Sequence, residues 1–205
     1  MAAPPAPPPL AVHVVDDDEP LLRALTLLLE SSGRVVRAHA SAEDFLKTLE
    51  VETTGCVVAD VRMPGMSGLE LQEALARRGA DVPIIVITGH GDVPMAVQAL
   101  KGGALDFLQK PFGEEQFLQS VAAAMDRAER TRAERDTART LRERAALLTP
   151  REREVMQLVV EGSGNQAIAE GLGISIRTVE AHRAAVMAKM QAQRVSDLVR
   201  MALTL

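Results

Sequence analysis

The chain has 205 residues and a formal net charge of −5, and 47% of its residues are hydrophobic and 25% charged. This length suits one or two domains with apolar cores, and the composition excludes collagenous, disulfide-rich and wholly disordered proteins. No apolar run reaches the roughly 18–20 residues of a membrane-spanning helix, so we expect no membrane segment. The single cysteine, Cys56, cannot form an internal disulfide, which favours a cytoplasmic location.

Residues 1–9 are rich in proline and contain no Lys or Arg, which is typical of a disordered tail and not of a signal peptide. The formal charge is uneven along the chain: −8 over residues 1–115, +2 over residues 116–149 and +1 over residues 150–205. None of these parts has the strongly basic balance of an autonomous nucleic-acid-binding domain.

Residues 10–120 alternate between short β-rich runs and longer stretches with helical spacing. The β-rich runs cover residues 12–15, 34–38, 56–59, 84–87 and 104–108. Five strand–helix units of this kind predict an α/β doubly wound fold, in which a five-stranded parallel sheet of flavodoxin-like type has helices on both faces. Binding sites in such sheets lie at the carboxyl ends of the strands.

The stretch from Glu114 to about Ala146 is rich in Ala, Arg, Glu and Gln and contains neither Pro nor Gly, which predicts one long helix. We assign residues 121–147 to a helical linker that continues the last helix of the first domain. A heptad seam would meet Thr131 and Arg135, so a solvated connector is favoured over a sustained coiled coil.

Residues 148–205 predict a small all-α domain. Thr149, Pro150 and Glu152 supply an N-cap, a first-turn proline and a capping-box acid. We expect Asn165 to cap a second helix, Ser175 to cap a third from 176 to about 191, and a last helix over 195–202. A tight turn with Gly173 joins the second and third helices, which is typical of a helix-turn-helix domain.

Carboxylates follow two of the predicted strands. Asp16 and Asp17 come after the first strand, and Asp60 ends the third. If both strands lie centrally, three carboxylates meet at one edge, where a cation must offset their repulsion and oxygen-only ligands favour Mg²⁺. The alternative is that residues 16–19 only cap the next helix; that explains Asp18 and Glu19 but not Asp60.

Two further strands end in polar side chains at the same edge. Thr88 follows the fourth strand and Lys110 the fifth. Together with the carboxylates they form the set that a phosphoryl acceptor requires. Asp60 would be the nucleophile, Lys110 and the metal would neutralise charge on the transferred group, and Thr88 would hydrogen-bond to it.

Residues 10–120 resemble the receiver domain of two-component response regulators, including the run Asp60-Val61-Arg62-Met63-Pro64-Gly65 and the pair Lys110-Pro111. Residues 148–205 resemble the LuxR-type helix-turn-helix of the NarL/FixJ family, in the runs from Leu148 to Val155 and from Ile174 to Arg183. The resemblance covers nearly the whole chain and implies a phosphorylation-activated transcription regulator.

By this resemblance, Asp60 is the phosphorylation site and Phe107 the switch aromatic. Mg²⁺ is held by Asp16, Asp17, Asp60 and the backbone carbonyl of Arg62. The implied partners are a sensor histidine kinase, double-stranded promoter DNA and a second copy of the phosphorylated chain, with RNA polymerase as a further candidate.

On the predicted third helix of the C-terminal domain, Ile176, Val179, Val186 and Met190 form an apolar stripe, and Arg177 and several alanines lie opposite. The candidate DNA-contacting residues are Asn165, Gln166, Arg177, Thr178, Glu180, Ala181, His182, Arg183, Ala184 and Lys189. Arg177, Thr178 and Lys189 suit phosphates, and an alanine suits a thymine methyl group. Glu180 could accept from a cytosine amino group or lie in solvent, and the stem of Arg183 could pack against the stripe instead. With so little positive charge, two copies on one site are expected.

Two other functions are weighed against this one. A Mg²⁺-dependent phosphohydrolase similar to the haloacid dehalogenase group would carry a second Asp two residues after its nucleophile, where this chain has Arg62. A regulator that works without phosphorylation would not need the intact set of Asp16, Asp17, Asp60, Thr88 and Lys110. We therefore expect no enzymatic turnover beyond self-phosphotransfer and slow dephosphorylation.

Overall fold

The computed structural model describes residues 9–49, 55–89 and 93–205. The predicted disordered tail lies outside these residues except for its last position. The chain forms two compact units that divide between Arg132 and Ala133. In the described part, no helix is both long enough and apolar enough to cross a membrane.

The N-terminal unit is built on the predicted sheet. Its strands are β1 (Ala11–Val15), β2 (Val35–His39), β3 (Gly55–Asp60), β4 (Ile84–Thr88) and β5 (Asp106–Gln109). They pair in parallel in the order β2-β1-β3-β4-β5. The interior strands β1, β3 and β4 are buried along their whole length because helices cover both faces. β5 begins two residues later than predicted. The Ala104 N–H instead donates to the carbonyl oxygen of Ala99, which belongs to the helix before the strand.

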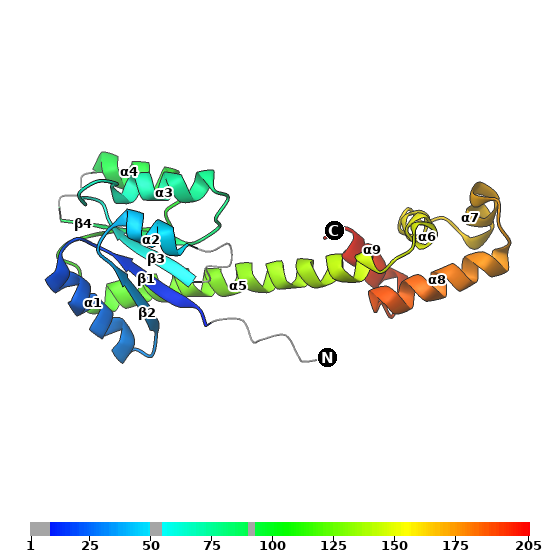
Figure 1. Ribbon diagram of the computed structural model, residues 1–205, viewed down its shortest axis with the longest axis horizontal. Helices are drawn as coiled ribbons and strands as arrows, with labels where there is room; N and C mark the ends of the chain where they lie inside the picture. The colour runs from blue at the N-terminus through cyan, green and yellow to red at the C-terminus, as the bar shows by residue number, and fades with distance from the viewer. Residues whose placement is uncertain (1–8, 50–54, 90–92) are drawn as a thin grey trace. The chain divides into compact units, whose positions relative to one another are not determined.

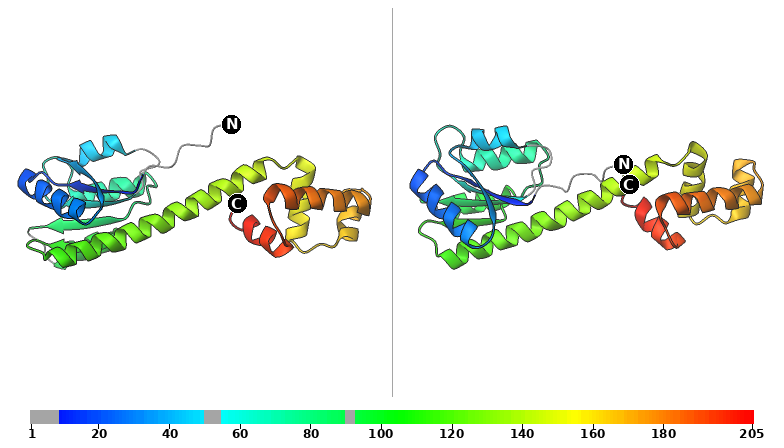
Figure 2. Two further views of the ribbon diagram at one scale, coloured as in Figure 1. Left: turned by 90° about the horizontal axis from the view of Figure 1, so that it is seen from below. Right: turned by 60° about the horizontal axis from the view of Figure 1, so that its bottom comes forward.

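Two layers of helices flank the sheet (Figures 1 and 2). α1 (Glu19–Ser31) and the start of α5 (Glu114–Ala146) cover one face, and α2 (Ala42–Thr48), α3 (Gly68–Arg77) and α4 (Val93–Lys101) cover the other. Leu22, Leu25, Phe117 and Val121 fill the first interface, and Phe45 and Leu71 lie in the second. The carboxyl ends of β1, β3, β4 and β5 therefore share one edge.

Local capping fixes how two helices leave that edge. The Asp18 side chain accepts the Leu21 N–H at the start of α1, and Ser67 and Glu70 form a capping box at the start of α3. Gly68 packs directly on β3: a Cβ atom there would lie 2.3 Å from the Asp60 carbonyl oxygen. The segment after Asp60 thus turns tightly against the strand end.

The C-terminal unit contains the predicted helices α6 (Pro150–Val160), α7 (Asn165–Leu172), α8 (Ile176–Met190) and α9 (Val195–Ala202). Thr149 and Glu152 form the expected capping box, Gly173 adopts a left-handed conformation with φ of 64°, and Ser175 caps α8. The expectation that Asn165 caps α7 is wrong. Gly164 is the N-cap residue, and the Asn165 side chain, one position inside the helix, accepts from Arg183.

An ion pair between a buried carboxylate and a partly exposed lysine joins α6 to α8. Glu152 is only 6% exposed, and its carboxylate accepts from the Lys189 ammonium at 2.7 and 2.9 Å as well as from the Thr149 N–H. The bond to Lys189, followed by that to Thr149, lowers the pKa of Glu152. Arg144, in the last turns of α5, donates to the Met190 carbonyl oxygen, so the end of α5 packs with this unit.

Two histidines are buried together beneath α2. His13 Nδ1 lies 3.1 Å from His39 Nε2, and both rings meet the edge of Phe45. Burial, followed by the nearby His39 and Arg37, lowers the pKa of His13 to about 4. Burial also lowers the pKa of His39. The pair is therefore held neutral by its surroundings.

This burial predicts an acid-sensitive N-terminal unit. Between pH 6.5 and 4, His13 is protonated in the unfolded chain but stays neutral in the folded chain. The contribution of His13 to the free energy of unfolding is therefore fully present above pH 6.5 and decreases as the pH falls. From pH 7 to 5, His13 should contribute a loss of about 2 kcal/mol in the free energy of unfolding. Urea titrations of wild type and His13→Gln at both pH values measure it, and equal pH dependence in the two proteins would refute it.

Candidate functional site

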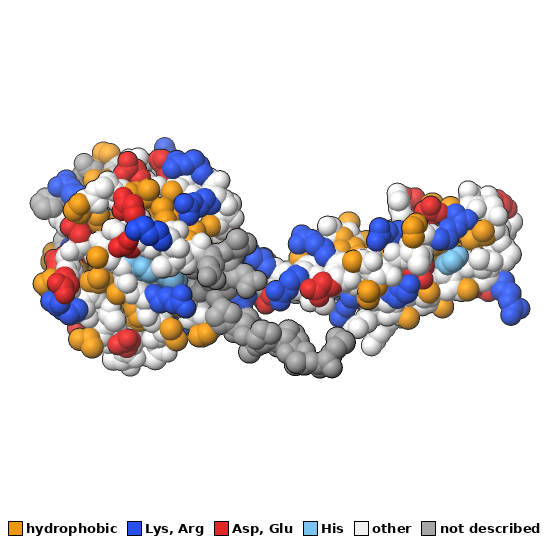
Figure 3. All heavy atoms as spheres, viewed as in Figure 1, with side chains coloured by type: hydrophobic (Ala, Val, Ile, Leu, Met, Phe, Trp, Pro, Cys, Tyr) orange, Lys and Arg blue, Asp and Glu red, His pale blue; other side chains and the backbone are white. Residues whose placement is uncertain are grey.

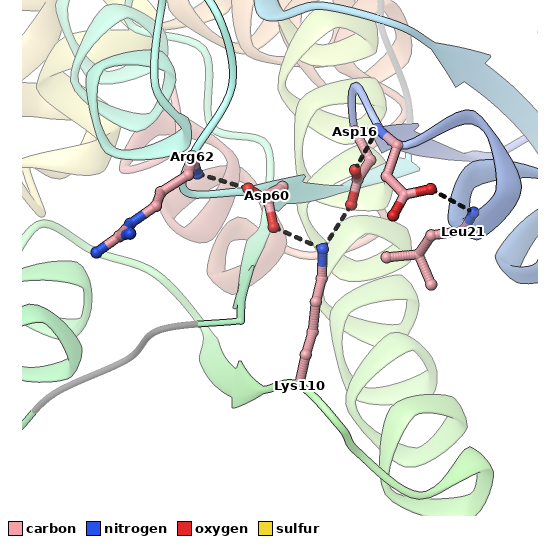
Figure 4. Close-up of polar contacts among 6 residues, drawn as sticks. Asp16, Leu21, Asp60, Arg62 and Lys110 are labelled. Atoms are coloured by element: carbon pink, nitrogen blue, oxygen red, sulfur yellow. Dashed lines mark hydrogen bonds and ion pairs between the residues drawn. The ribbon is translucent and has the colours of Figure 1, made fainter.

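One ammonium group lies between two carboxylates at the carboxyl edge of the sheet. Lys110 Nζ donates to Asp60 Oδ1 at 2.6 Å and to Asp16 Oδ2 at 2.8 Å (Figure 4). Asp16 and Asp60 are 1% and 5% exposed, so the two anions need a close cation in this setting. Three strand ends that the sequence separates widely are thus joined by one side chain.

Backbone groups orient both carboxylates. Asp16 Oδ1 accepts the Asp18 N–H at 2.9 Å, and Asp60 Oδ2 accepts the Arg62 N–H at 2.5 Å. Burial raises the pKa of Asp16, against the opposing hydrogen bonds from Lys110 and Asp18. Burial disfavours the charge of Lys110, but its bonds to Asp16 and Asp60 outweigh this effect and raise its pKa. One oxygen of each carboxylate is thus fixed by the backbone while the other holds the ammonium.

The predicted magnesium ligands divide into two groups. Asp16 and Asp60 reach a common cation, and their oxygens are of the type that Mg²⁺ prefers. Asp17 is exposed on the loop that follows. Arg62, whose backbone carbonyl is the predicted ligand, donates its N–H to Asp60, and its side chain points away (Figure 4). Across the described ranges, no three acidic, His or Cys side chains are already gathered as a metal site. The carboxylate oxygens of Asp16 and Asp60 are donors that fit Mg²⁺, and in this structure both carboxylates are bound by Lys110.

Thr88 and Phe107 lie beside this centre on β4 and β5. Asp60 is in register with Ile87, so Thr88 stands one residue further along the same edge, fully buried. The Lys110 N–H donates to the Thr88 carbonyl oxygen at 2.7 Å, which ties the two strand ends together. Phe107, half-buried, packs against the apolar core beneath α2, α3 and α4.

A residue outside the sequence-based set holds the loop that follows Asp60. Glu43 of α2 accepts the Met66 N–H at 2.9 Å. Gly65 has a φ of 79°, and a Cβ atom there would lie 2.7 Å from Glu43 Oε1. Nothing in the local sequence pattern pointed to this contact, because the two partners are 23 residues apart.

The predicted DNA-contacting residues fall on α7 and α8. Arg177, Glu180, Ala181 and Ala184 are exposed on α8, and His182 is half-buried. The Thr178 hydroxyl lies 2.8 Å from that of Ser175, and the Gln166 amide donates to Glu170 on α7. The exposed members therefore lie on one side of α8.

The two other cations of α8 are already engaged within the unit. The Lys189 ammonium is held by Glu152, and Arg183 Nη1 donates to Asn165 Oδ1 at 2.6 Å. Ile176 also departs from expectation: it is 46% exposed, whereas Val179, Val186 and Met190 are buried as predicted. As the first residue of the helix, Ile176 extends past the end of the core that the rest of the stripe covers.

The surface of the C-terminal unit carries both signs of charge. In Figure 3, blue and red side chains are interspersed over the visible face of this unit. Such a mixture matches its near-neutral formal charge and supplies little long-range attraction to a polyanion.

Comparison with known families accounts for both units. The response regulator receiver domain matches residues 12–122, and the family of bacterial regulatory proteins of the LuxR type matches residues 146–202. The two matches lie in the order that the sequence predicts.

Full-length relatives share this arrangement. The chain is 49% identical to the transcriptional regulatory protein FixJ of Azorhizobium caulinodans, over 96% of this chain and 93% of that protein. It is 46% identical to nodulation protein W of Bradyrhizobium diazoefficiens, over 95% of this chain and 86% of that protein.

Solved structures agree with the fold. The response regulator StyR matches with a TM-score of 0.86 at 40% identity, covering 95% of this chain and 98% of that one. Full-length FixJ from B. japonicum matches with a TM-score of 0.57 at 43% identity, covering 95% and 96%. The chain belongs to the NarL/FixJ family of response regulators and is a phosphorylation-dependent transcription regulator of a two-component system.

Proposed function

We propose that Asp60 accepts the phosphoryl group and that the donor is a phosphohistidine of a sensor kinase. The observation that carries this assignment is the Lys110 ammonium shared by Asp60 and Asp16 at the carboxyl edge. It supplies a nucleophilic carboxylate, a second carboxylate and a cation within hydrogen-bonding distance of one another. Receiver 10–120, linker 121–147 and reader 148–205 are the corresponding domains in this proposal.

In the transfer step, an Asp60 carboxylate oxygen attacks phosphorus while the bond from phosphorus to the donor nitrogen breaks. The bonding pair stays with the histidine, and Asp60 becomes an acyl phosphate. Lys110 offsets the charge on the phosphoryl oxygens, and the Thr88 hydroxyl donates to one of them. Attack by water later releases inorganic phosphate and restores Asp60, which is the slow dephosphorylation that limits the signal.

Asp16, Asp17, Asp60 and the Arg62 carbonyl would hold Mg²⁺, whose chemistry is to neutralise phosphoryl charge. The oxygen-only donor set supports this assignment. Mg²⁺ at these carboxylates would supply the positive charge that Lys110 supplies here, and Lys110 would then be free to contact the phosphoryl group on Asp60. In this proposal, Lys110 neutralises the two carboxylates in the unphosphorylated chain and contacts the phosphoryl group after phosphorylation.

Movement of Thr88 and Lys110 would alter the surface formed by α4 and β5, which lie between these two residues in the sequence. Phe107, the proposed switch aromatic, lies on β5, three residues before Lys110. The helix α4 follows β4, which ends at Thr88. Val93, Val97 and Leu100 of α4 are 79%, 43% and 50% exposed, an apolar face suited to pairing two phosphorylated copies. A pair of readers would then bind two half-sites of promoter DNA, which offsets the weak charge of each one.

The phosphorylation site is tested by labelling the full chain with acetyl phosphate and Mg²⁺. Intact mass should rise by one phosphoryl group in wild type and not in Asp60→Asn, because the substitution removes the carboxylate that we propose as the nucleophile. Asp18→Asn keeps a good helix cap and serves as the matched control, which should label like wild type. Removing the metal with a chelator should slow labelling by at least about tenfold. Equal labelling of Asp60→Asn would overturn the assignment.

The output step is tested by sedimentation at matched salt, with and without a beryllofluoride phosphate mimic. We predict a mainly monomeric unmodified chain and a dimerisation constant at least about tenfold tighter with the mimic, with parallel gains on two-half-site DNA. Asp60→Asn should not respond. Equal dimerisation in both states would mean that phosphate acts by releasing the reader from the receiver.

A third test separates the roles of Lys189 and Arg177, two of the three Lys and Arg side chains of α8. Lys189→Met leaves the buried Glu152 without its cation, so the melting temperature of the C-terminal unit should fall by several degrees while the salt dependence of DNA binding stays unchanged. Arg177→Met should leave melting unchanged and reduce the slope of log affinity against log salt by about one per chain. Calorimetry and salt titrations on duplex DNA measure both effects, and the reverse pattern would exclude these roles.

A further inference from the structure

The loop over residues 61–67 joins the end of β3 to α3, and its first residues are tied to the strand ends. The Arg62 N–H donates to Asp60 Oδ2 at 2.5 Å (Figure 4). The Val61 N–H donates to the carbonyl oxygen of Ile87 on β4 at 2.9 Å. This loop therefore supplies one of the hydrogen bonds that orient the Asp60 carboxylate.

The far part of the same loop is held by α2. The half-buried Glu43 accepts the Met66 N–H through Oε1 at 2.9 Å. The carboxylate lies close against the loop, because a Cβ atom on Gly65 would lie 2.7 Å from the same oxygen. Met63 and Met66 also belong to the apolar cluster that contains Phe45 of α2. Helix α2 thus adds a charged hydrogen-bond acceptor to its apolar packing against the loop.

The hydrogen bond at Met66 limits the conformations of the residues that lead to it. Met66 follows Arg62 by four positions, and each intervening residue has only two soft backbone dihedral angles. Fixing the Met66 N–H therefore restricts the peptide group that carries the Arg62 carbonyl oxygen. A carboxylate acceptor makes a stronger bond than a neutral one, so Glu43 suits this role.

Resting on the proposed phosphorylation of Asp60, we propose that Glu43 is a positioning residue for that reaction. Glu43 keeps the loop over residues 61–67 in the conformation in which Arg62 presents its N–H to Asp60 and its carbonyl oxygen to the proposed Mg²⁺ site. It acts through the hydrogen bond to Met66 and not through contact with the phosphoryl group.

The first test compares the rate at which acetyl phosphate and Mg²⁺ label the full chain, followed by intact mass. Glu43→Ala should slow labelling of Asp60 about three- to tenfold, the range that loss of one hydrogen bond implies. Glu43→Gln removes the negative charge but keeps an oxygen that can accept the Met66 N–H. This variant should restore most of the wild-type rate.

Asp44→Ala is the matched control. Asp44 is the neighbouring acid in the first turn of α2, and its exposed carboxylate pairs with Lys47 at 2.7 Å and not with the loop. Its removal takes a similar favourable charge from the start of the helix. Asp44→Ala should therefore melt like Glu43→Ala but become labelled at the wild-type rate.

Amide hydrogen exchange measures the loop directly, without phosphoryl donor or metal. Exchange of the Met66 N–H, followed by nuclear magnetic resonance, should be at least about threefold faster in Glu43→Ala than in wild type, because the bond that protects it is lost. Glu43→Gln and Asp44→Ala should exchange like wild type at this position.

Three outcomes would overturn the proposal. They are labelling of Glu43→Ala at the wild-type rate, labelling of Glu43→Gln as slow as that of Glu43→Ala, or unchanged exchange at Met66 in Glu43→Ala. The second would mean that the charge of Glu43 matters and not its hydrogen bond. A wild-type chain that takes no label at Asp60 would instead contradict the phosphorylation on which the proposal rests, so the two failures are distinguishable.

Discussion

The contact of Lys110 with both Asp16 and Asp60 is the constraint on which the receiver depends. Two carboxylates this deeply buried are stable together only with a cation between them, and the strand order supplies it from β5. In the proposed mechanism, the same ammonium leaves Asp16 when Asp60 is phosphorylated. A single electrostatic balance therefore both stabilises the resting fold and makes it responsive.

The reader uses its charges in a different way. Its ion pair between Glu152 and Lys189 joins α6 to α8 and uses a cation that could otherwise contact a DNA phosphate. The result is a unit with weak intrinsic attraction to DNA. Such a unit is well suited to control by pairing, because a weak reader occupies its site stably only with a linked partner, whereas a strong reader would bind alone.

Much of this architecture was predictable from sequence because its signals are local. Apolar runs located all five strands, and the cap at Thr149 placed α6 to the residue. Convergence of Asp16, Asp60 and Lys110 followed from parallel topology, although 94 residues separate the first from the last. The contact of Glu43 with Met66, the partners of Lys189 and Arg183, and the exposure of Ile176 did not follow. These depend on three-dimensional packing at element ends, where a helical projection assumes a neighbour that is absent.

We infer that Lys110 carries the signal from Asp60 to the output surface, and Lys110→Ala separates phosphorylation from dimerisation directly. Phosphorylation and sedimentation should be measured on one sample of this variant with acetyl phosphate and Mg²⁺. We expect Asp60 still to become labelled to a substantial level while the protein stays monomeric, because this variant has no ammonium to contact the phosphoryl group. Labelled Lys110→Ala that dimerises as tightly as phosphorylated wild type would contradict it.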